Sequence, residues 1–518
     1  MLADFDIAII GSGFAGSLTA LIARQLGHRV VLIERTRHPR FVIGESSTPL
    51  ADQLWGELTA RYQLRQLAPL GKWGTWQRAH PQLACGLKRG FTFLHHRAGR
   101  EWTDTADRER QLLVAASSRD ETADTHWYRP DFDAFLVREA QAQGVEYLDD
   151  TTLLAAAPGA LSVMLNGQRR GQPIELRARF VVDASGPRGF LFRTLGLPEV
   201  AFAHQPATQA LYSHFTGVRR LEELGVPPGA EAAPYPPDDA AVHHVFDGGW
   251  IWVLRFNNGL TSAGAAVTDR VANDLELSDR EPAWQRLLDR FPTVRDQFAE
   301  ARLAQPFLHS PRLPFRCGTM VGERWALLPY AGGFIDPLLS TGFPLTLLGI
   351  DRLANALAAG LDSPEFPRRL EAYARASRDE LLAAERLIAS LYATMRDAPS
   401  FNLVSLLYFA AAAYSEIARR LDRAPLAGGF LLHDHPVFGP RSRVVGNLAL
   451  AAAGRSTYPP GLRQRLRRVV LDAIGPIDAT GLSRVERRNW YPVEASDLID
   501  AAPKFGLSEA EMARFTTA

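Results

Sequence analysis

The chain has 518 residues, too many for one hydrophobic core, so two or three domains are expected. Its 58 Lys and Arg residues against 57 Asp and Glu residues leave a net charge of +1, which favours neither a nucleic-acid partner nor an acidic membrane surface. Two cysteines, Cys85 and Cys317, exclude a disulfide framework and a cysteine-rich metal site, as is typical of a cytoplasmic protein. We expect no bound metal.

Targeting and membrane signals are weak. The first residues are acidic, at Asp4 and Asp6, and lead directly into a predicted strand, so we expect no signal peptide. The longest apolar stretch, Leu403–Tyr414, contains Ser405 and is too short to cross a bilayer. We therefore expect a cytoplasmic protein without a transmembrane segment.

The N-terminal residues have the order of a dinucleotide-binding unit. Phe5–Ile10 is apolar and predicts a buried parallel strand. The sequence GSGFAG (residues 11–16) follows directly, and a helical pattern then leads to a second predicted strand, Val30–Ile33, which ends at Glu34. Strand, glycine motif, helix, strand and terminal acid in this order form the βαβ fingerprint.

Each residue of this fingerprint has a physical role. Gly11 allows the tight turn, Gly13 lets the backbone approach a pyrophosphate, and Gly16 lets the helix pack closely on the strand. The N-terminus of the helix offers free N–H groups and a partial positive charge to the phosphates. Glu34 lies where a carboxylate accepts ribose hydroxyls and repels a 2′-phosphate. The residues predict NAD or FAD.

The next segments give mixed signals. The Ser/Thr cluster before Leu50 predicts the cap of a helix over Ala51–Arg61. Arg37 and Arg40 could contact a phosphate, and a solvated loop is an equally good interpretation. Residues 85–94 alternate as in a strand, which places Phe91 and Phe93 on one face and Lys88 on the other. From the pattern alone, an edge-strand lysine whose charge reaches solvent is favoured over a desolvated lysine with an altered pKa.

The middle of the chain mixes helices, strands and loops. Residues 98–125 are polar and predict a surface excursion; a helix follows over residues 129–142 and a strand over residues 145–148. A hairpin is expected around Asn166-Gly167. It leads to a buried strand that ends in Asp183 and a small-residue turn at Gly186, the pattern of a further backbone approach to a cofactor.

Two later segments could form parts of a site. Trp250 and Trp252 share one strand face and could form an aromatic wall, although core packing is the commoner role of such residues. Residues 325–342 predict a strand, a Gly-Gly turn and a Ser-Thr-Gly cap of a long helix, and successive N–H groups at such a turn form an anion-binding concavity. A helix is predicted over Pro282–Phe298.

The last third, from about Ser363, is mostly helical, with breaks at Pro399, Gly428–Gly429, Pro436 and Gly439. Gly461–Ile474 is basic and amphipathic, and a solvated helix face is favoured there over a partner surface.

Six of these segments together resemble the flavin-dependent halogenases. The segments are residues 11–16 (GSGFAG), 38–49 (HPRFVIGESSTP), 85–93 (CGLKRGFTF), 181–186 (VVDASG), 248–258 (GGWIWVLRFNN) and 327–342 (LLPYAGGFIDPLLSTG). Their sequence is most similar to the branch that acts on free phenols, the phloroglucinol-type halogenases of pyoluteorin biosynthesis. The helical last third matches only in general character.

The resemblance implies an α/β fold of the p-hydroxybenzoate-hydroxylase-like flavoprotein type, with a mixed-sheet substrate domain and a helical C-terminal region. The expected FAD-binding domain is discontinuous and comprises residues 1–60, 129–200 and 306–362. Residues 61–128 and 201–305 would form the substrate-binding domain, and residues 363–518 would cover the substrate site.

The implied reaction uses reduced FAD, supplied by a separate flavin reductase, with O2 and chloride or bromide. Halide becomes hypohalous acid, which passes through the protein to a lysine. That lysine hydrogen-bonds the hypohalous acid or carries the halogen as a chloramine, and a small electron-rich aromatic, by this resemblance a phenol, is halogenated. A homodimer is compatible with the resemblance. Such enzymes serve antibiotic and other secondary-metabolite biosynthesis.

The resemblance also assigns residues. It implies Lys88 as the catalytic lysine, and a halide site at Pro337, Thr341 and Gly342. It implies a barrier between substrate and flavin, or a substrate pocket, formed by Trp250, Trp252, Phe91 and Phe93. The implied FAD contacts are Gly11, Gly13, Phe14, Ala15, Gly16, Glu34, Arg35, Arg40, Ser46, Asp183, Gly186, Gly333, Phe334, Ile335 and Asp336.

Three positions depart from the family pattern. Leu254-Arg255 replaces the Ile-Pro of the WxWxIP signature, and Pro329-Tyr330 replaces a usual Gly-Asp before the flavin loop. Leu339 stands where tryptophan halogenases place a glutamate, which argues against a tryptophan substrate. These departures leave two alternatives open: a flavoprotein monooxygenase or dehydrogenase of an aromatic substrate, and a flavin-binding relative without catalysis.

Overall fold

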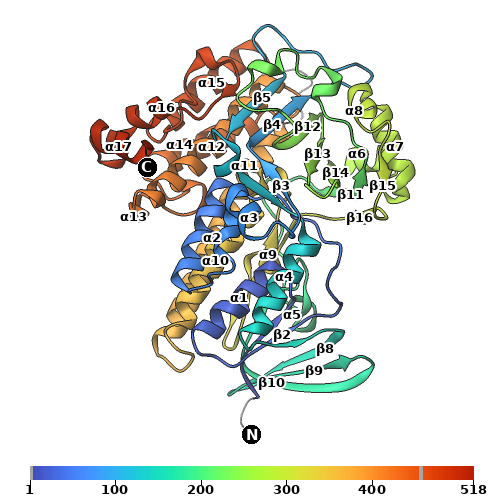
Figure 1. The fold of residues 1–518 in the computed structure, drawn as a ribbon, viewed down its shortest axis with the longest axis vertical. Coiled ribbons are helices and arrows are strands. Elements are labelled where there is room, and N and C mark those ends of the chain that lie inside the picture. Colours follow the sequence, from blue (N-terminus) through green and yellow to red (C-terminus); the bar gives the residue numbers. More distant parts are fainter. Residues whose placement is uncertain (1–3, 454–458, 518) are drawn as a thin grey trace.

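A computed structural model describes residues 4–453 and 459–517. It contains two large sheets and a set of C-terminal helices (Figure 1). The N-terminal sheet and its helices occupy the lower part of the view, and the second sheet lies above them, between two groups of helices.

The first sheet is the predicted dinucleotide-binding sheet. Five neighbouring strands run parallel, in the order β19-β10-β1-β2-β7, and β18, β9 and β8 extend the sheet in antiparallel pairings. The strands are β1 (Phe5–Ile10), β2 (Val30–Ile33), β7 (Glu146–Leu148), β8 (Thr151–Pro158), β9 (Val163–Arg169), β10 (Gln172–Asp183), β18 (Val321–Gly322) and β19 (Trp325–Leu327). The helices α1 (Phe14–Gln25), α4 (Arg129–Ala142) and α10 (Gly342–Leu357) belong to this part of the fold. The α/β prediction is confirmed, because β1, α1 and β2 follow one another as expected.

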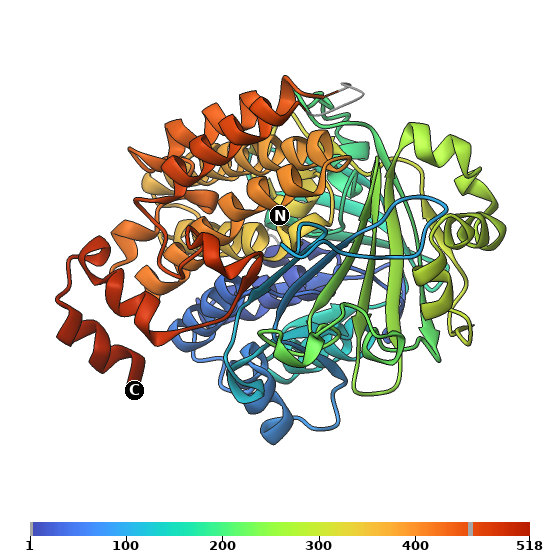
Figure 2. The same cartoon turned by 90° about the horizontal axis from the view of Figure 1, so that it is seen from above.

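The second sheet has nine strands, in the order β15-β11-β14-β13-β12-β4-β5-β21, with β16 paired to β11. The strands are β4 (Gly90–His95), β5 (Gln111–Ala115), β11 (Thr208–Thr216), β12 (Ala241–Phe246), β13 (Gly249–Arg255), β14 (Thr261–Thr268), β15 (Arg302–Leu303), β16 (Leu308–Ser310) and β21 (Trp490–Tyr491). Because strand side chains alternate, its two faces contribute to different cores. The face bearing Trp250 and Trp252 packs toward the C-terminal helices, and the opposite face packs on α6 (Asp269–Asp274), α7 (Glu281–Asp289) and α8 (Pro292–Gln297) (Figure 2).

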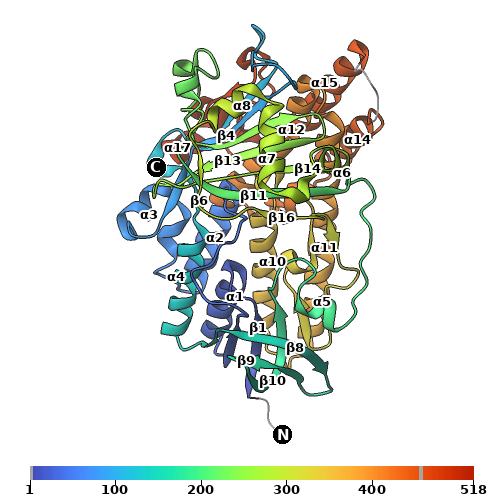
Figure 3. The ribbon, with the colours of Figure 1, turned by 90° about the vertical axis from the view of Figure 1, so that its right-hand side faces the viewer.

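The last third is helical, as predicted. Its main helices are α11 (Glu365–Thr394), α12 (Ala398–Arg420), α14 (Phe438–Leu450) and α15 (Pro460–Ile474), followed by α16 (Ala495–Asp500) and α17 (Glu509–Thr517) (Figure 3). Among the described residues, α12 alone is long and apolar enough to span a bilayer. The helix extends beyond the apolar stretch Leu403–Tyr414 at both ends, which is why it is longer than the sequence predicted. Of its most apolar 18 residues, 78% are buried inside the fold, as is typical of a core helix.

The prediction of one strand over residues 85–94 is wrong. Two short strands are present, β3 (Cys85–Lys88) and β4; β3 pairs with β6 (Asp124–Trp127), whereas β4 enters the nine-stranded sheet. Arg89 separates the strands and donates its backbone N–H to the Asp239 carbonyl at 2.6 Å. The alternation is therefore interrupted, and the Lys88 amine lies over the ring of Phe91 rather than on the opposite face.

Two other local predictions need correction. The hairpin turn lies at Arg170-Gly171, where both residues have positive φ (50° and 79°), and Asn166-Gly167 lies inside β9. Gly167 is needed for another reason: a Cβ atom there would lie 2.3 Å from the Thr152 carbonyl oxygen. Residues 98–125 include the buried strand β5, which the charged residues around it concealed.

Smaller differences concern helix ends. Pro282–Phe298 is divided into α7 and α8 at Pro292, since proline favours the first turn of a new helix. Gly439 lies in the first turn of α14 rather than at a break. The predicted cap of α2 (Pro49–Arg61) is confirmed: the Thr48 hydroxyl accepts a hydrogen bond from the Ala51 N–H.

The side-chain amide of Asn402 hydrogen-bonds α12 to the second sheet. The Asn402 side chain donates to the carbonyl oxygens of Glu109 (3.1 Å) and Gln111 (3.0 Å), and its Oδ1 lies 3.1 Å from His95 Nε2. All of these contacts are buried or nearly so, which makes an unpaired group costly.

We expect Asn402→Ala to lower the free energy of unfolding by about 2–4 kcal/mol, because it leaves two carbonyl groups and one imidazole without their partner. Urea denaturation followed by tryptophan fluorescence measures this loss. Asn447→Ala is the matched control, since Asn447 is exposed and bonds only Arg386 among the described side chains. Equal stability of the two variants would contradict the assigned role of Asn402.

Candidate functional site

The glycine motif forms a tight turn between β1 and α1. Gly11 has φ of +97°, and a Cβ atom there would lie 2.7 Å from the Ala184 carbonyl oxygen. A Cβ atom at residue 16 would lie 1.9 Å from the Gly11 carbonyl oxygen, so helix and turn are in contact through Gly16. No side chain caps α1, whose N-cap residue is Gly13, and its first N–H groups remain available to an anion.

Two arginines face this turn. The position of a Cβ atom on Gly13 lies 3.3 Å from Nη2 of Arg129 and 3.7 Å from Nη2 of Arg40. Asp133 holds the buried Arg129 through two hydrogen bonds, Nε to Oδ1 at 2.8 Å and Nη2 to Oδ2 at 2.9 Å. Sequence reasoning missed Arg129, although an arginine four residues before an aspartate at a helix start was the available signal.

Glu34 is buried at the end of β2 and already holds part of the turn. Its Oε2 accepts from the Ser12 N–H (3.1 Å) and from Arg40 Nη2 (3.3 Å), and its Oε1 accepts from the Thr36 N–H (3.1 Å). Burial raises the pKa of Glu34, but Arg40 and these N–H groups lower it more, so the pKa lies below its ordinary value. Glu34 is therefore an ionised acceptor.

Three other residues singled out by the sequence lie outside the glycine turn or serve a structural role: Arg35, Arg37 and Asp183. Arg35 is exposed, and Arg37 forms ion pairs with Asp149 and Asp150 away from the turn. Asp183 is fully buried, and its carboxylate accepts from the N–H groups of Ser185 and Leu191, so its side chain stabilises the turn into α5 (Phe190–Thr194).

The fingerprint residues fit the FAD that the sequence predicts. Arg40 Nε is buried without a hydrogen-bond partner among the described residues. Gly13 leaves space beside two guanidinium groups, and Glu34 offers an ionised carboxylate 23 residues beyond Gly11. A pyrophosphate with an adjacent ribose has the charge and the hydroxyl groups that these residues can bind.

The second predicted anion-binding turn precedes α10. Pro337 begins it, and Leu339 and Ser340 have positive φ (63° and 53°), the left-handed conformation that non-glycine residues rarely adopt. This conformation directs the chain into α10, whose first-turn N–H groups have no acceptor within the helix. The side chain of Thr341, the N-cap residue, makes no capping hydrogen bond to them.

A small cavity lies against this turn. Thr341 and Gly342 line it together with Gly333, Phe334 and Ile335, three of the residues predicted to contact FAD. Tyr330, one of the family departures, is also in the lining; its ring centre lies 4.9 Å from that of Phe334. The cavity thus joins the predicted flavin loop to the predicted halide turn.

Asp336 connects this turn to the aromatic wall. Its Oδ1 accepts from the Leu338 N–H (2.9 Å) and from Trp250 Nε1 (3.2 Å), and its Oδ2 accepts from the Tyr392 hydroxyl (2.8 Å). Burial raises the pKa of Asp336 to about 6, against the effect of these hydrogen bonds. The Asp336 carboxylate therefore links Trp250 of the wall to the turn before α10.

The wall is part of a row of rings. Trp252 and Trp250 lie 5.6 Å apart between ring centres, Trp250 and His243 5.1 Å, His243 and Phe93 4.4 Å, and Phe93 and Phe91 6.3 Å. Helix α12 covers the Phe91 end of this row. The row therefore leads from the turn before α10 to Phe91.

The departure at Arg255 leaves this wall intact. Arg255 is on the opposite strand face and bonds Asp238 through Nε at 2.9 Å. It also donates to the backbone carbonyl groups of Val218 and Arg219. Its side chain therefore stabilises a loop on the other side of the sheet.

Lys88 lies at the far end of the row of rings. Its side chain is fully buried, and its amine is 3.9 Å from the centre of the Phe91 ring. The amine donates to the Ser46 hydroxyl (2.8 Å) and to the Ser47 carbonyl oxygen. Burial lowers the pKa of Lys88 to about 7, although Asp124 and Asp52 oppose this shift. This amine can gain or lose a proton near neutral pH.

Ser46, predicted as an FAD contact, is thus bonded to the predicted catalytic lysine. Phe91 and Phe93 lie on the same side as Lys88, as a site requires. Among the described residues, no group of three or more His, Cys, Asp or Glu side chains could hold a metal ion.

We expect Gly13→Val to weaken FAD binding at least tenfold, because the added side chain crowds Arg129 and fills the space beside it. Quenching of flavin fluorescence on titration with the protein measures the dissociation constant. Gly56→Ala is the control, since Gly56 has open space around its Cβ position. An unchanged FAD affinity in Gly13→Val would contradict the assignment.

Comparison with known proteins gives the family. The tryptophan halogenase family matches residues 125–403, and an NAD(P)-binding Rossmann-like domain matches residues 9–77. The chain is 30% identical over 403 residues to the monodechloroaminopyrrolnitrin halogenase PrnC of Pseudomonas fluorescens, covering 76% of this chain and 68% of that protein. It is 28% identical over 426 residues to the tetracycline 7-halogenase of Kitasatospora aureofaciens, covering 79% and 73%.

The fold agrees with that of a halogenase of known structure. A crystal structure of the halogenase PltM in complex with phloroglucinol and FAD superposes with a TM-score of 0.84 at 24% identity, over 93% of this chain and 99% of that one. FAD is the cofactor, with halide and O2 as co-substrates. The chain belongs to the tryptophan halogenase family and is an FAD-dependent halogenase.

Proposed function

We propose that this enzyme halogenates a small, free, phenolic aromatic through hypohalous acid and Lys88. The observation that carries the proposal is the Lys88 amine, which is fully buried, lies against the Phe91 ring and has a pKa of about 7. A buried amine of this kind can interact with hypohalous acid in a water-poor site.

FAD would bind along the first sheet, with its pyrophosphate at Gly13, Arg129 and Arg40 and a ribose at Glu34. When bound in its reduced form, it supplies the electrons with which O2 converts halide to hypohalous acid. The sequence contains one dinucleotide fingerprint, which supports a separate flavin reductase as the source of reduced FAD.

We place the halide at the turn of Pro337, Thr341 and Gly342. The free N–H groups at the start of α10 offer donors and the partial positive charge of a helix N-terminus. The adjoining cavity includes the residues of the predicted flavin loop, so halide and flavin would be neighbours.

At Lys88 the halogen would pass from oxygen to nitrogen and then to carbon. The neutral amine attacks the halogen of hypohalous acid; an N–X bond forms, the O–X bond breaks, and the amine proton leaves with hydroxide as water. The aromatic carbon then attacks the halogen, a C–X bond forms, the N–X bond breaks with its electron pair left on nitrogen, and the proton lost from the ring returns to that nitrogen. The sum is one hypohalous acid and one C–H bond converted to water and one C–X bond.

The substrate would lie beyond the wall, away from the flavin. Trp250 and Trp252 separate the turn before α10 from the Lys88 end of the row of rings, which opposes direct hydroxylation at the flavin. Leu339, where tryptophan halogenases have a glutamate, and the phloroglucinol in the PltM structure support a phenol.

We also propose the domain division given above, with residues 61–128 and 201–305 as the substrate-binding domain. The separate sheets support it, since β1, β2, β10 and β19 share one sheet and β4, β5 and β11–β14 share the other. Two strands cross the proposed boundaries: β16 and β21 both join the second sheet.

We expect Lys88→Met to reduce halogenation of a phenol at least a hundredfold without abolishing FAD binding, because, among the described residues, the Lys88 amine contacts Ser46, Ser47 and Phe91 and no residue of the fingerprint. Turnover with FAD, a flavin reductase, NADH, O2 and bromide is followed by mass spectrometry, which detects the bromine isotope pair. Lys504→Arg is the control, since the Lys504 amine donates to the carbonyl oxygens of Gly475 and Asp478 and contacts none of the proposed site residues in the described part of the chain.

The same assay separates the alternatives. An unchanged rate in Lys88→Met sinks the role of the lysine. A hydroxylated product that forms without halide identifies a monooxygenase instead.

A further inference from the structure

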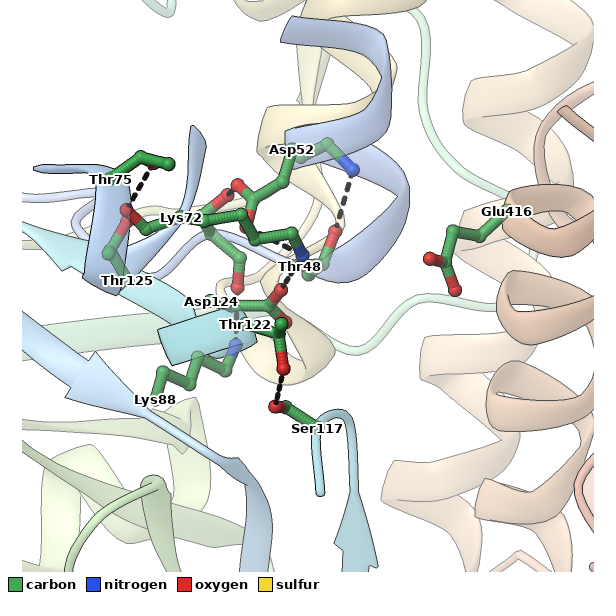
Figure 4. A network of polar contacts seen from close by, with 12 residues as sticks. Thr48, Asp52, Lys72, Thr75, Lys88, Ser117, Thr122, Asp124, Thr125 and Glu416 are labelled. Carbon is green, nitrogen blue, oxygen red and sulfur yellow. Dashed lines mark hydrogen bonds and ion pairs between the residues drawn. The ribbon is translucent and has the colours of Figure 1, made fainter. Parts of the chain in front are cut away.

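Lysine is rare in this chain. Only three of its 58 basic residues are lysines, namely Lys72, Lys88 and Lys504, and the rest are arginines. An ammonium group can lose its proton in a protein, whereas a guanidinium group stays charged. Two of the three lysines occupy one polar cluster (Figure 4), so this cluster is where the chain retains amines.

Lys72 holds two buried carboxyl groups. Its amine lies 2.8 Å from Asp124 Oδ1 and 3.6 Å from Asp52 Oδ2, and both carboxyl side chains are fully buried. The Lys72 side chain itself keeps 36% of its surface exposed. Burial of the ammonium lowers the pKa of Lys72, but Asp124 and Asp52 raise it more, so Lys72 remains charged.

Lys88 has no such partner. It stands directly opposite Asp124 in the pairing of β3 with β6, on the same face of that ladder. Its amine nevertheless bonds only the Ser46 hydroxyl and the Ser47 carbonyl oxygen, and in residues 4–453 and 459–517 no carboxylate lies within ion-pair distance of it. The nearest carboxylate on its strand pair is bound to Lys72 instead.

The charges of the cluster balance without Lys88. Burial and the adjacent Asp124 carboxylate raise the pKa of Asp52 well above its usual range. Neither Asp52 Oδ2 nor Asp124 Oδ2 has a hydrogen-bond donor among the described residues, as expected for two carboxyl groups that share a proton. The pair then carries one negative charge, which the Lys72 ammonium matches.

We propose that Lys72 is a positioning residue for halogenation: it binds both carboxyl groups of the Asp52–Asp124 pair and thereby leaves the Lys88 amine without a counter-ion. The proposal rests on the proposed function of Lys88. Its consequence is that Lys88 loses its proton near neutral pH and offers a lone pair to the halogen.

The other titratable groups around the two lysines do not replace this balance. His126 on β6 and His243 on β12 face Lys88; burial, with the charge of Lys88, lowers the pKa of each, so both stay neutral near pH 7. Tyr408 of α12 is buried, which raises the pKa of its phenol. Glu416 of α12 lies on the Lys72 side and pairs with Arg420 at 3.3 Å.

The three lysines permit a direct measurement. Protein labelled with ¹³C and ¹⁵N in lysine alone gives three side-chain signals, and Lys504→Arg and Lys88→Met assign them. The Lys88 signal of the wild-type protein should titrate near pH 7. In Lys72→Met its midpoint should rise by about one pH unit or more, because the carboxylate pair then lacks a cation.

Asp124→Asn should move the Lys88 midpoint in the opposite direction, since it removes negative charge next to the amine. Lys72→Arg keeps the charge and should leave the midpoint within about 0.3 of the wild-type value. Opposite shifts in Lys72→Met and Asp124→Asn, with rescue by Lys72→Arg, support the proposal. A Lys88 midpoint that stays the same in both variants overturns it.

The pH profile of halogenation gives the second readout. The acid limb of the rate should move up with the Lys88 midpoint in Lys72→Met, so that the rate at pH 7 falls about tenfold and recovers at higher pH. FAD affinity reports that each variant is folded, and Lys72→Gln replaces Lys72→Met if the latter does not bind FAD. The NMR titration needs no turnover, so failure of the proposed reaction and failure of this proposal are distinguishable.

Discussion

The cost of burying a positive charge determines the design of the proposed catalytic centre. An amine without water or a counter-ion favours its neutral form, and Lys88 meets both conditions because two serine oxygens and one aromatic ring surround its amine. The carboxylate nearest in register is held elsewhere. The absence of a carboxylate partner thus lowers the proton affinity of the buried Lys88 amine, so an ordinary lysine is sufficient at this position.

The two sheets serve this centre in different ways. The first binds through its backbone: a turn that excludes Cβ atoms, uncapped N–H groups, and arginines held by carboxylates. The second contributes a row of packed rings between the turn before α10 and Lys88. Asp336 joins the two, since one carboxylate bonds both the turn and Trp250. A displacement of the turn before α10 would therefore move Trp250, and a displacement of Trp250 would move the turn.

The local sequence was sufficient to predict an element where a single pattern defines both of its ends. The strands β1 and β2 and the helix α4 have the predicted bounds, because apolar runs, glycines and a proline define them. It was insufficient where tertiary pairing decides: Arg89 separates two strands by bonding Asp239, a residue 150 positions away. Lys72 and Asp52 were missed for the same reason, since their roles depend on Asp124, a neighbour distant in sequence. Lys88 itself was found only through the resemblance.

The strand β21 has a consequence for biosynthesis. It contributes only Trp490 and Tyr491, yet it covers the edge of β5, and the Asn489 carbonyl accepts from the Leu113 N–H at 2.8 Å. The strands of the first sheet all precede Leu328 in number, whereas the second sheet receives this edge strand from residues 490–491, far along the chain from β5. During synthesis β5 therefore keeps an open edge until residues 490–491 have been made. An open edge pairs readily with other chains, so β21 protects β5 against aggregation once it is in place.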